Sequence, residues 1–173
     1  GVLGMVPGEL MTTDEGYATG INTDEDILKI AVVERHNYTG HIGIGYIKGY
    51  GLKSGAVATS ISHDSHNIIV VGTNDEDMAA AVNHIAENGG GITVFDGGKC
   101  IGDVKLGIAG LMSDDPLIDV NRNLEDAKVR AFELGVSKLI DPFMTLSFMS
   151  LPVIPKLRLT TRGVFDVESQ SYV

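Results

Sequence analysis

A short polar segment between two apolar runs holds the residue types best suited to chemistry in this sequence. It contains two imidazoles, His63 and His66, the carboxylate of Asp64, and the side chains of Ser65 and Asn67. A neutral imidazole can accept a proton near neutral pH or bind a metal ion, and a nearby carboxylate can orient it. Glycine, proline, asparagine and aspartate would suffice for a simple turn. We therefore take this segment as the candidate site.

The two histidines can act on one ligand only if the chain turns between them. In an extended strand, side chains three residues apart point to opposite faces, so His63 and His66 would diverge. A metal site made by both histidines is compatible with the spacing but is not required by it. The competing interpretation is a polar hairpin tip whose side chains satisfy backbone groups. The residues alone leave both interpretations open.

Other patterns that signal chemistry are missing from the sequence. There is no Cys-x-x-Cys pair, no Gly-x-Ser-x-Gly nucleophile elbow and no phosphate-binding P-loop. The single cysteine, Cys100, has no evident base beside it and is interpreted as structural. The acidic residues Asp75, Glu76 and Asp77 are expected in the first turn of a helix, where the helix dipole favours negative charge.

The elements that must position the candidate site are strands. Short runs rich in β-branched residues predict strands at 27–34, 56–62 and 68–72, and the last two flank the polar segment. Residues 42–50 alternate apolar residues with glycine, which predicts a strand whose glycine face is approached closely by another segment. Residues 92–104 are expected to form a β-hairpin around a glycine turn.

Two main helices are expected between and after these strands. The first begins at Thr73 or Asn74 and ends at a run of glycines, and the second occupies residues 116–134. Two strands followed by a helix occur in residues 56–88 and again in residues 92–134, which hints at a duplicated ββα unit. The predicted fold is therefore mixed α/β or α+β, with sheet layers and two main helices.

The composition excludes several classes of protein. The formal net charge is −10 at pH 7, whereas binding to nucleic acids or to anionic membrane surfaces requires clustered lysine and arginine. No apolar run approaches the ~20 residues that span a membrane. One cysteine excludes an internal disulfide and fits a reducing compartment, so we expect a cytoplasmic protein. The sequence begins with Gly1 rather than methionine, which is typical of a processed product or a fragment.

The segment Ser60-Ile61-Ser62-His63-Asp64-Ser65-His66-Asn67 and the residues around it resemble the C-terminal domain of bacterial adenine deaminases, which belong to the amidohydrolase superfamily. The similar stretches are residues 26–33, 43–51, 55–78, 108–114, 142–148 and 151–157. They follow one another in the same order from residue 26 to the end of the chain. Cys100 and Gly107 stand where an aliphatic residue or proline is expected, which argues further against a functional role for Cys100.

This resemblance implies part of an enzyme that hydrolyses adenine to hypoxanthine and ammonia, a reaction of purine salvage. In that family a (β/α)₈ barrel holds a binuclear iron or manganese centre that activates water. Such a barrel needs ~250 residues, so it lies outside this chain, and no metal is expected here. Residues 26–173 then form the C-terminal domain. Residues 1–25 are expected to be an arm or linker, a remnant of the small β-domain that flanks such barrels.

Two functions are compatible with the resemblance. In the first, the domain packs on the catalytic barrel and offers the polar segment to the adenine site: His63, Asp64 and His66 support catalysis, and Ser65 and Asn67 bind substrate. In the second, it is a non-catalytic interaction domain with a structural histidine loop, which forms a homo-oligomer. Unsatisfied imidazoles on a concave exposed face would favour the first function. In both cases the chain alone is not expected to deaminate adenine.

Overall fold

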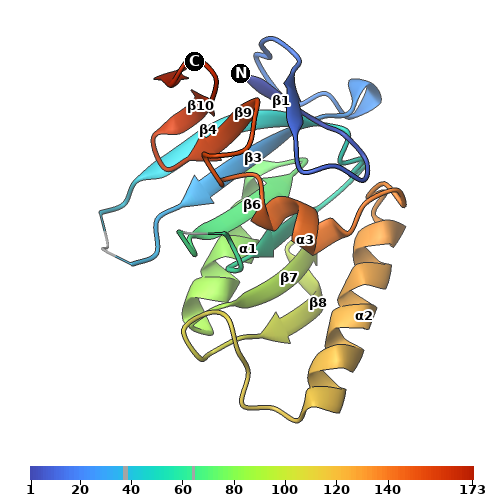
Figure 1. Ribbon diagram of the computed structural model, residues 1–173. Coiled ribbons are helices and arrows are strands. Elements are labelled where there is room, and N and C mark those ends of the chain that lie inside the picture. Colours follow the sequence, from blue (N-terminus) through green and yellow to red (C-terminus); the bar gives the residue numbers. More distant parts are fainter. Residues whose placement is uncertain (37–38, 64) are drawn as a thin grey trace.

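The computed structural model describes residues 1–36, 39–63 and 65–173, and its strands form one large and one small sheet (Figure 1). The strands of the large sheet are β1 (Val2–Met5), β2 (Thr12–Asp14), β3 (Ile27–Val33), β4 (Ile42–Lys48), β5 (Ala56–Thr59), β6 (Ile68–Gly72), β7 (Gly91–Asp96) and β8 (Lys99–Lys105). Their order across the sheet is β2-β1-β4-β3-β6-β5-β7-β8. Neighbouring strands are antiparallel, except that β1 and β4 are parallel.

The small sheet and the helices complete the domain. The small sheet contains β9 (Leu157–Thr160), β10 (Gly163–Asp166) and β11 (Ser171–Tyr172), in the order β11-β10-β9. The helices are α1 (Asp75–Glu87), α2 (Leu117–Glu133) and α3 (Pro142–Ser147), with a 3₁₀ turn η1 (Thr23–Glu25). The predicted mixed α+β class is confirmed, and the described residues contain no (β/α)₈ barrel.

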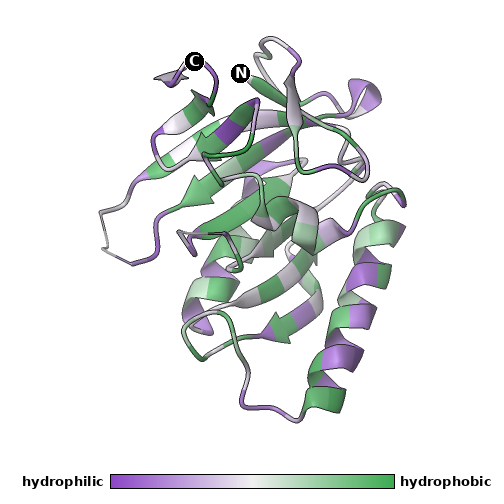
Figure 2. Cartoon of the chain, viewed as in Figure 1, coloured by the Kyte–Doolittle hydropathy of each residue, from purple (hydrophilic) through white to green (hydrophobic). Residues whose placement is uncertain are grey.

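Helices α1 and α2 cover opposite faces of the large sheet. Ala56 and Ala58 of β5 pack with α1, whereas Val57 belongs to the apolar cluster that contains Ala127 of α2. Because successive side chains of a strand point to opposite faces, the two helices lie on different sides. The buried strands are accordingly hydrophobic along much of their length, while α2 is polar on the side away from the sheet (Figure 2). The expected order of two strands and a helix is present twice, as β5-β6-α1 and β7-β8-α2.

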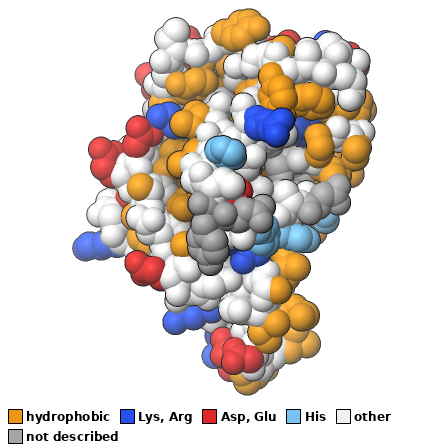
Figure 3. Space-filling model, turned by 90° about the vertical axis from the view of Figure 1, so that its left-hand side faces the viewer, with side chains coloured by type: hydrophobic (Ala, Val, Ile, Leu, Met, Phe, Trp, Pro, Cys, Tyr) orange, Lys and Arg blue, Asp and Glu red, His pale blue; other side chains and the backbone are white. Residues whose placement is uncertain are grey.

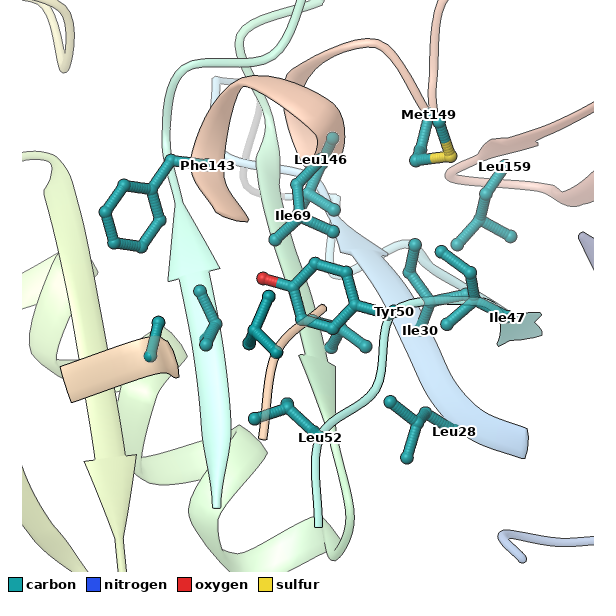
Figure 4. Packing of buried hydrophobic residues seen from close by; sticks show 14 of the residues in the cluster. Leu28, Ile30, Ile47, Tyr50, Leu52, Ile69, Phe143, Leu146, Met149 and Leu159 are labelled. Carbon is teal, nitrogen blue, oxygen red and sulfur yellow. The ribbon is translucent and has the colours of Figure 1, made fainter. Parts of the chain in front are cut away.

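Tyr50 anchors the larger apolar cluster, which lies between the sheet and α3. Figure 4 shows its ring among aliphatic side chains that include Ile30, Leu52 and Ile69. The hydroxyl group donates a hydrogen bond to the carbonyl oxygen of Pro142 at 2.8 Å, which ties the segment after β4 to the start of α3. Burial, and secondarily the negative charge of Asp141, raise the pKa of Tyr50 well above its usual value, so the hydroxyl stays protonated and can donate.

The small sheet covers the glycine face of β4, as the alternation of glycine in that strand predicts. A side chain at Gly43 would overlap the backbone carbonyl of Thr160, and one at Gly45 would lie 2.8 Å from the Cγ2 atom of Val164. Only a residue without a Cβ atom allows strands β9 and β10 to approach this closely. The prediction of a close approach to this strand is therefore confirmed.

The main helices begin and end close to the predicted positions. Asn74 caps α1, because its Oδ1 atom accepts a hydrogen bond from the backbone N–H of Asp77 at 2.8 Å. Helix α2 begins directly after Pro116 and is followed by Leu134 and Gly135, where the sequence predicted its end. None of the helices in the described ranges has the length and apolar character needed to cross a membrane.

The first residues of the chain are part of the large sheet. Strand β1 pairs with β4, and β2 pairs with β1. The side chain of Thr12 donates a hydrogen bond to the carbonyl of Leu157 at 2.7 Å and so connects β2 to the small sheet. The prediction that residues 1–25 derive from a separate flanking domain remains a prediction.

Candidate functional site

The candidate polar segment connects β5 to β6 at one end of the large sheet. These neighbouring strands are antiparallel, with Thr59 opposite Ile69, so the intervening residues must reverse direction. The reversal is fixed by buried hydroxyl groups. Ser60 donates a hydrogen bond to the carbonyl of Gly110 at 2.6 Å, and the hydroxyl groups of Ser62 and Ser150 lie 2.7 Å apart. The described residues on both sides of the turn are therefore held in place by the rest of the domain.

The segment turns at His66. Such a turn is required if His63 and His66 are to contact the same ligand. His66 has a φ angle of 49°, in the left-handed region, and its N–H group donates to the carbonyl of Ser62 at 2.9 Å. The Nδ1 atom of His66 is buried and has no hydrogen-bond partner among the described residues. A buried imidazole nitrogen without a partner is costly, so it is expected to have one in the working protein.

A pocket with a volume of about 300 Å³ lies against the segment. Its lining residues come from four parts of the chain and are mostly polar: Val32, His63, Ser65, Asn67, Ser150, Pro152, Thr160 and Thr161. The volume is at the lower end of the range of about 300–1,000 Å³ that is typical of small-molecule sites. Three of the predicted site residues, His63, Ser65 and Asn67, thus line one cavity. His66 is not among its lining residues, and Asp64 lies outside the described residues.

His63 is held by the end of helix α3. Its ring stacks on Phe148, with ring centroids 4.1 Å apart and an angle of 21° between the planes. Its backbone N–H donates to the carbonyl of Ser147 at 2.9 Å. The stacking fixes the plane of the imidazole and leaves its ring nitrogens free for other partners, because no side-chain hydrogen bond of His63 exists among the described residues.

Helix α3 is itself fixed by Asp141 at its N-terminus. The carboxylate accepts hydrogen bonds from the N–H groups of Phe143 at 3.0 Å and Met144 at 2.9 Å, and lies 3.3 Å from the Nζ atom of Lys128. Partial burial alone would raise the pKa of Asp141, but the two N–H donors and Lys128 outweigh it, so the pKa lies below its usual range. The carboxylate is therefore charged at neutral pH and supports the helix that holds His63.

Arg35 is a residue of this site that the sequence analysis did not single out. Its Nε atom donates to the carbonyl of His66 at 3.0 Å, and its backbone N–H donates to the Oδ1 atom of Asn67 at 3.3 Å. The two Nη atoms donate to the carbonyls of Gly89 at 3.3 Å and Ala109 at 2.9 Å. One guanidinium group thus joins the polar segment to the end of α1 and to the loop after β8.

His36 also contacts the segment, through its Nε2 atom, which lies 3.0 Å from the carbonyl oxygen of Ser65. Figure 3 shows histidine side chains gathered near the middle of one face, close to basic side chains. Arg35 and His36 reach the polar segment because β3 pairs with β6, with Val33 opposite Ile68. This register places the residues that follow β3 beside those that precede β6. It joins two strands that are far apart in the sequence, so local patterns do not reveal it.

The described residues of the segment contain no group of three possible metal ligands. Within the described ranges, one group of three possible ligand side chains lies close together, and it consists of His84, Cys100 and Asp103 in α1 and β8. The two-histidine metal site remains one of the two interpretations that the sequence allows, because Asp64 between the histidines lies outside the described residues. What the segment offers is a set of hydrogen-bonding groups beside a cavity.

Comparison with known proteins places this arrangement in a family. The model of the adenine deaminase C-terminal domain matches residues 8–171. Adenine deaminase 2 of Carboxydothermus hydrogenoformans is 48% identical over 99% of this chain, and adenine deaminase of Bacillus licheniformis is 46% identical over 99% of it. Adenine deaminase of Bacillus subtilis is 52% identical over 88% of the chain.

The match covers nearly the whole chain but only part of each relative. The chain spans 31% of the length of the first two of these relatives and 26% of the third. It belongs to the adenine deaminase C-terminal domain family. The resemblance inferred from the sequence is thereby confirmed.

Proposed function

We propose that this chain is the C-terminal domain of an adenine deaminase, which hydrolyses adenine to hypoxanthine and ammonia in the cytoplasm. The observation that carries the proposal is the similarity over 99% of the chain to relatives that bear this name. Because the chain spans 31% of those relatives, we assign the catalytic barrel to the part of the protein outside it.

The metal ions implied by the resemblance, manganese or iron, would supply an activated water in that barrel. The described residues of this chain do not fit a binuclear centre of that kind. Their one group of three possible ligands contains a single imidazole, a thiol and a single carboxylate, too few to hold two ions. We therefore assign no hydrolytic step to this chain.

The part of the domain that we propose to face adenine is the polar segment. The purine ring carries nitrogens that accept and donate hydrogen bonds along its edges, and the pocket beside Ser65 and Asn67 is lined by groups that can match them. In this proposal Ser65 and Asn67 bind the substrate. His63 and His66, together with Asp64, exclude water and supply hydrogen bonds that strengthen during the reaction. The buried Nδ1 atom of His66, which has no hydrogen-bond partner among the described residues, supports this role.

The test is to replace His66 by asparagine in the full-length protein and to measure ammonia release. Asparagine tolerates a left-handed φ angle, so the turn is preserved while the imidazole is lost. We expect kcat/KM for adenine to fall by about tenfold or more. The melting temperature is expected to change by less than about 2 °C, because one nitrogen of the replaced ring makes no hydrogen bond to any described residue.

His41→Asn is the matched control, because His41 is exposed directly before β4 and is not part of the polar segment. It should leave both the rate and the melting temperature unchanged. A lower melting temperature for His66→Asn with an unchanged rate per folded molecule would make the segment a structural turn. The 173-residue chain alone, supplied with manganese or iron, should release no ammonia from adenine above the blank. Sustained turnover by that chain would contradict the assignment of the catalytic barrel outside it.

A second candidate function is contact with another domain or with a second copy of the chain. Exposed apolar residues on β4 favour it. Ile42 and Ile44 are 55% and 53% exposed. They line an open groove of about 370 Å³ together with Val33, Ala79 and Val82. Clustered exposed aliphatic side chains commonly mark contact surfaces. The two functions are compatible, since one part of the domain can contact another subunit or the barrel while the segment faces adenine.

A further inference from the structure

His84, Cys100 and Asp103 form a cluster of possible metal ligands away from the polar segment. His84 lies in the last turn of α1, and Cys100 and Asp103 lie on the edge strand β8. The Nε2 atom of His84 is 3.0 Å from Oδ2 of Asp103 and 3.9 Å from Sγ of Cys100. One ligand atom from each residue lies within 4.8 Å of the other two. The cluster is partly exposed, so an ion can reach it from solvent.

A β-bulge brings the two β8 ligands to the same face of the sheet. Residues three apart in a regular strand point to opposite faces. Here Cys100 lies opposite Phe95 and Asp103 lies opposite Thr93, while Ile101 has no cross-strand partner. This extra residue shifts the alternation, as bulges do when they redirect a side chain. Both ligands therefore face α1.

Three neighbouring contacts position the ligand side chains. The Nδ2 atom of Asn88 lies 3.2 Å from Nε2 of His84. The ring of Phe95 meets the imidazole of His84 edge to face, with centroids 5.5 Å apart. The hydroxyl of Thr93 lies 3.4 Å from the Cys100 sulfur. Such outer contacts restrict the orientation of ligand side chains before the ion arrives.

We propose that His84, Cys100 and Asp103 bind a single divalent transition-metal ion of the zinc type, with water as the fourth ligand. Zinc binds nitrogen, oxygen and sulfur ligands at about 2.0–2.3 Å, so ligand atoms of a tetrahedral site lie about 3.3–3.7 Å apart. The separations of 3.0 Å and 3.9 Å differ from these values by a few tenths of an ångström. Imidazole, thiolate and carboxylate are the three side-chain ligands that zinc prefers.

This inference departs from the sequence analysis, which interpreted Cys100 as structural and expected no metal in this chain. Burial raises the pKa of the Cys100 thiol, to which Asp103 adds, and the hydrogen bond from Thr93 opposes this. Without an ion the thiol is therefore protonated at neutral pH and donates to the carbonyl of Gly102 at 3.4 Å. An ion must displace that proton, and its positive charge favours the thiolate.

The experiment uses the fact that Cys100 is the single cysteine of the 173-residue chain. The rate of alkylation of this thiol by iodoacetamide is measured by intact mass, with and without one equivalent of zinc. We expect zinc to slow alkylation by about tenfold or more, because a metal-bound thiolate is a poorer nucleophile. One equivalent of cobalt should produce a thiolate-to-cobalt charge-transfer band. Equal alkylation rates with and without zinc would overturn the proposal.

Variants separate a three-residue site from binding by the thiol alone. His84→Ala and Asp103→Asn should each lose the protection of Cys100 by zinc and the cobalt band. His41→Ala, which removes an exposed imidazole outside the cluster, should retain both. If His84→Ala and Asp103→Asn keep full protection while circular dichroism shows them folded, zinc binds the thiol without these residues and the proposed site is wrong. If one of the two variants fails to fold, the other makes the same distinction.

Discussion

Tyr50 brings a hydroxyl group into the centre of an apolar cluster and satisfies it with one partner, the carbonyl of Pro142. The ring contributes packing that any aromatic side chain could supply. The hydroxyl adds a specific link between the segment after β4 and helix α3. Phe148 directly follows α3 and stacks on His63, so this link connects the core of the domain to the candidate site.

We predict that Tyr50→Phe lowers the free energy of unfolding by about 1–2 kcal/mol, because the buried carbonyl of Pro142 loses its hydroxyl partner while the packing is kept. Urea denaturation of the 173-residue chain measures the change. Tyr46→Phe is the matched control, because Tyr46 is only half-buried on β4 and should change stability by less than about 0.5 kcal/mol. Equal losses in the two variants would show that the hydroxyl of Tyr50 contributes nothing specific.

Arg158 is a second residue whose role depends on burial. It is fully buried on β9, and its guanidinium group donates to the carbonyls of Leu10, Phe148, Ile154 and Pro155. Within the described ranges no carboxylate pairs with it. Burial lowers its pKa to about 10, so it remains charged at neutral pH. Its several carbonyl partners offset the loss of hydration and tie the small sheet to the segments around it.

At the scale of elements, α3 is the short helix on which the orientation of His63 depends. Asp141 contributes in two ways, as a hydrogen-bond acceptor for the first turn and as a negative charge near Lys128. Its pKa is lower in the folded chain than its usual value. The stability that it contributes is therefore fully present above the unfolded pKa of about 3.9 and is lost as the pH falls through the folded pKa.

Two substitutions separate these contributions. We predict that Asp141→Ala lowers the free energy of unfolding at pH 7 by about 1 kcal/mol, because the helix loses its cap. Asp141→Asn keeps an acceptor for the cap and should cost less at pH 7. Both variants should lose less stability than the wild type between pH 5 and pH 3, since neither titrates at this position, and urea denaturation at each pH tests this. An unchanged acid dependence would mean that Asp141 has the same pKa folded and unfolded.

Local sequence signals predicted those elements whose ends are marked by their own residues. The position of α1 follows from Asn74 and the acidic first turn, and the hairpin of β7 and β8 from its glycine turn. Helix α3 was not predicted, although Asp141 followed by proline is a typical helix start. Strand β5 was predicted to reach Ser62 but ends at Thr59. Beyond Thr59 the hydroxyl of Ser60 bonds to the distant loop at Gly110, a contact that local sequence patterns do not reveal.

The candidate site was predicted in part. The polar run between two apolar runs marks its location in the sequence. Three of its residues, His63, Ser65 and Asn67, line one pocket. The roles of Arg35 and Phe148 depend on contacts between segments that are far apart in the chain, so they could not be read from local patterns. The bulge at Ile101 was likewise hidden, because it is a property of strand pairing.

At the scale of the whole molecule, the open face of β4 is the surface most suited to contact another chain or domain. Exposed apolar residues occur on β4 and in the tail, residues 143–155. Ile42 and Ile44 are exposed beside α1, and Met144 and Val153 of the tail are 62% and 70% exposed. Helix α1 packs on β5, β6 and β7. It does not cover Ile42 and Ile44 of β4, which lie on the same face of the sheet.

We predict that the 173-residue chain self-associates through this face and that the double substitution Ile42→Lys and Ile44→Lys abolishes the association. Lysine at both positions places two positive charges in an apolar contact that would have to exclude water. Sedimentation velocity over a range of concentrations measures the effect, and the melting temperature should stay unchanged because both residues are exposed. Met144→Lys is the control for the tail. A wild-type chain that remains monomeric at high concentration would remove the basis for this surface.

The two ends of the chain meet at the same strand, β10. A side chain at Gly1 would contact Val164, and the N–H of Val173 donates to the carbonyl of Val164 at 3.0 Å. Figure 1 shows both ends on one side of the molecule. Domains with adjoining termini commonly tolerate circular permutation. Joining Val173 to Gly1 through a short linker, and opening the chain between the exposed residues Thr19 and Gly20, would leave every strand pairing intact.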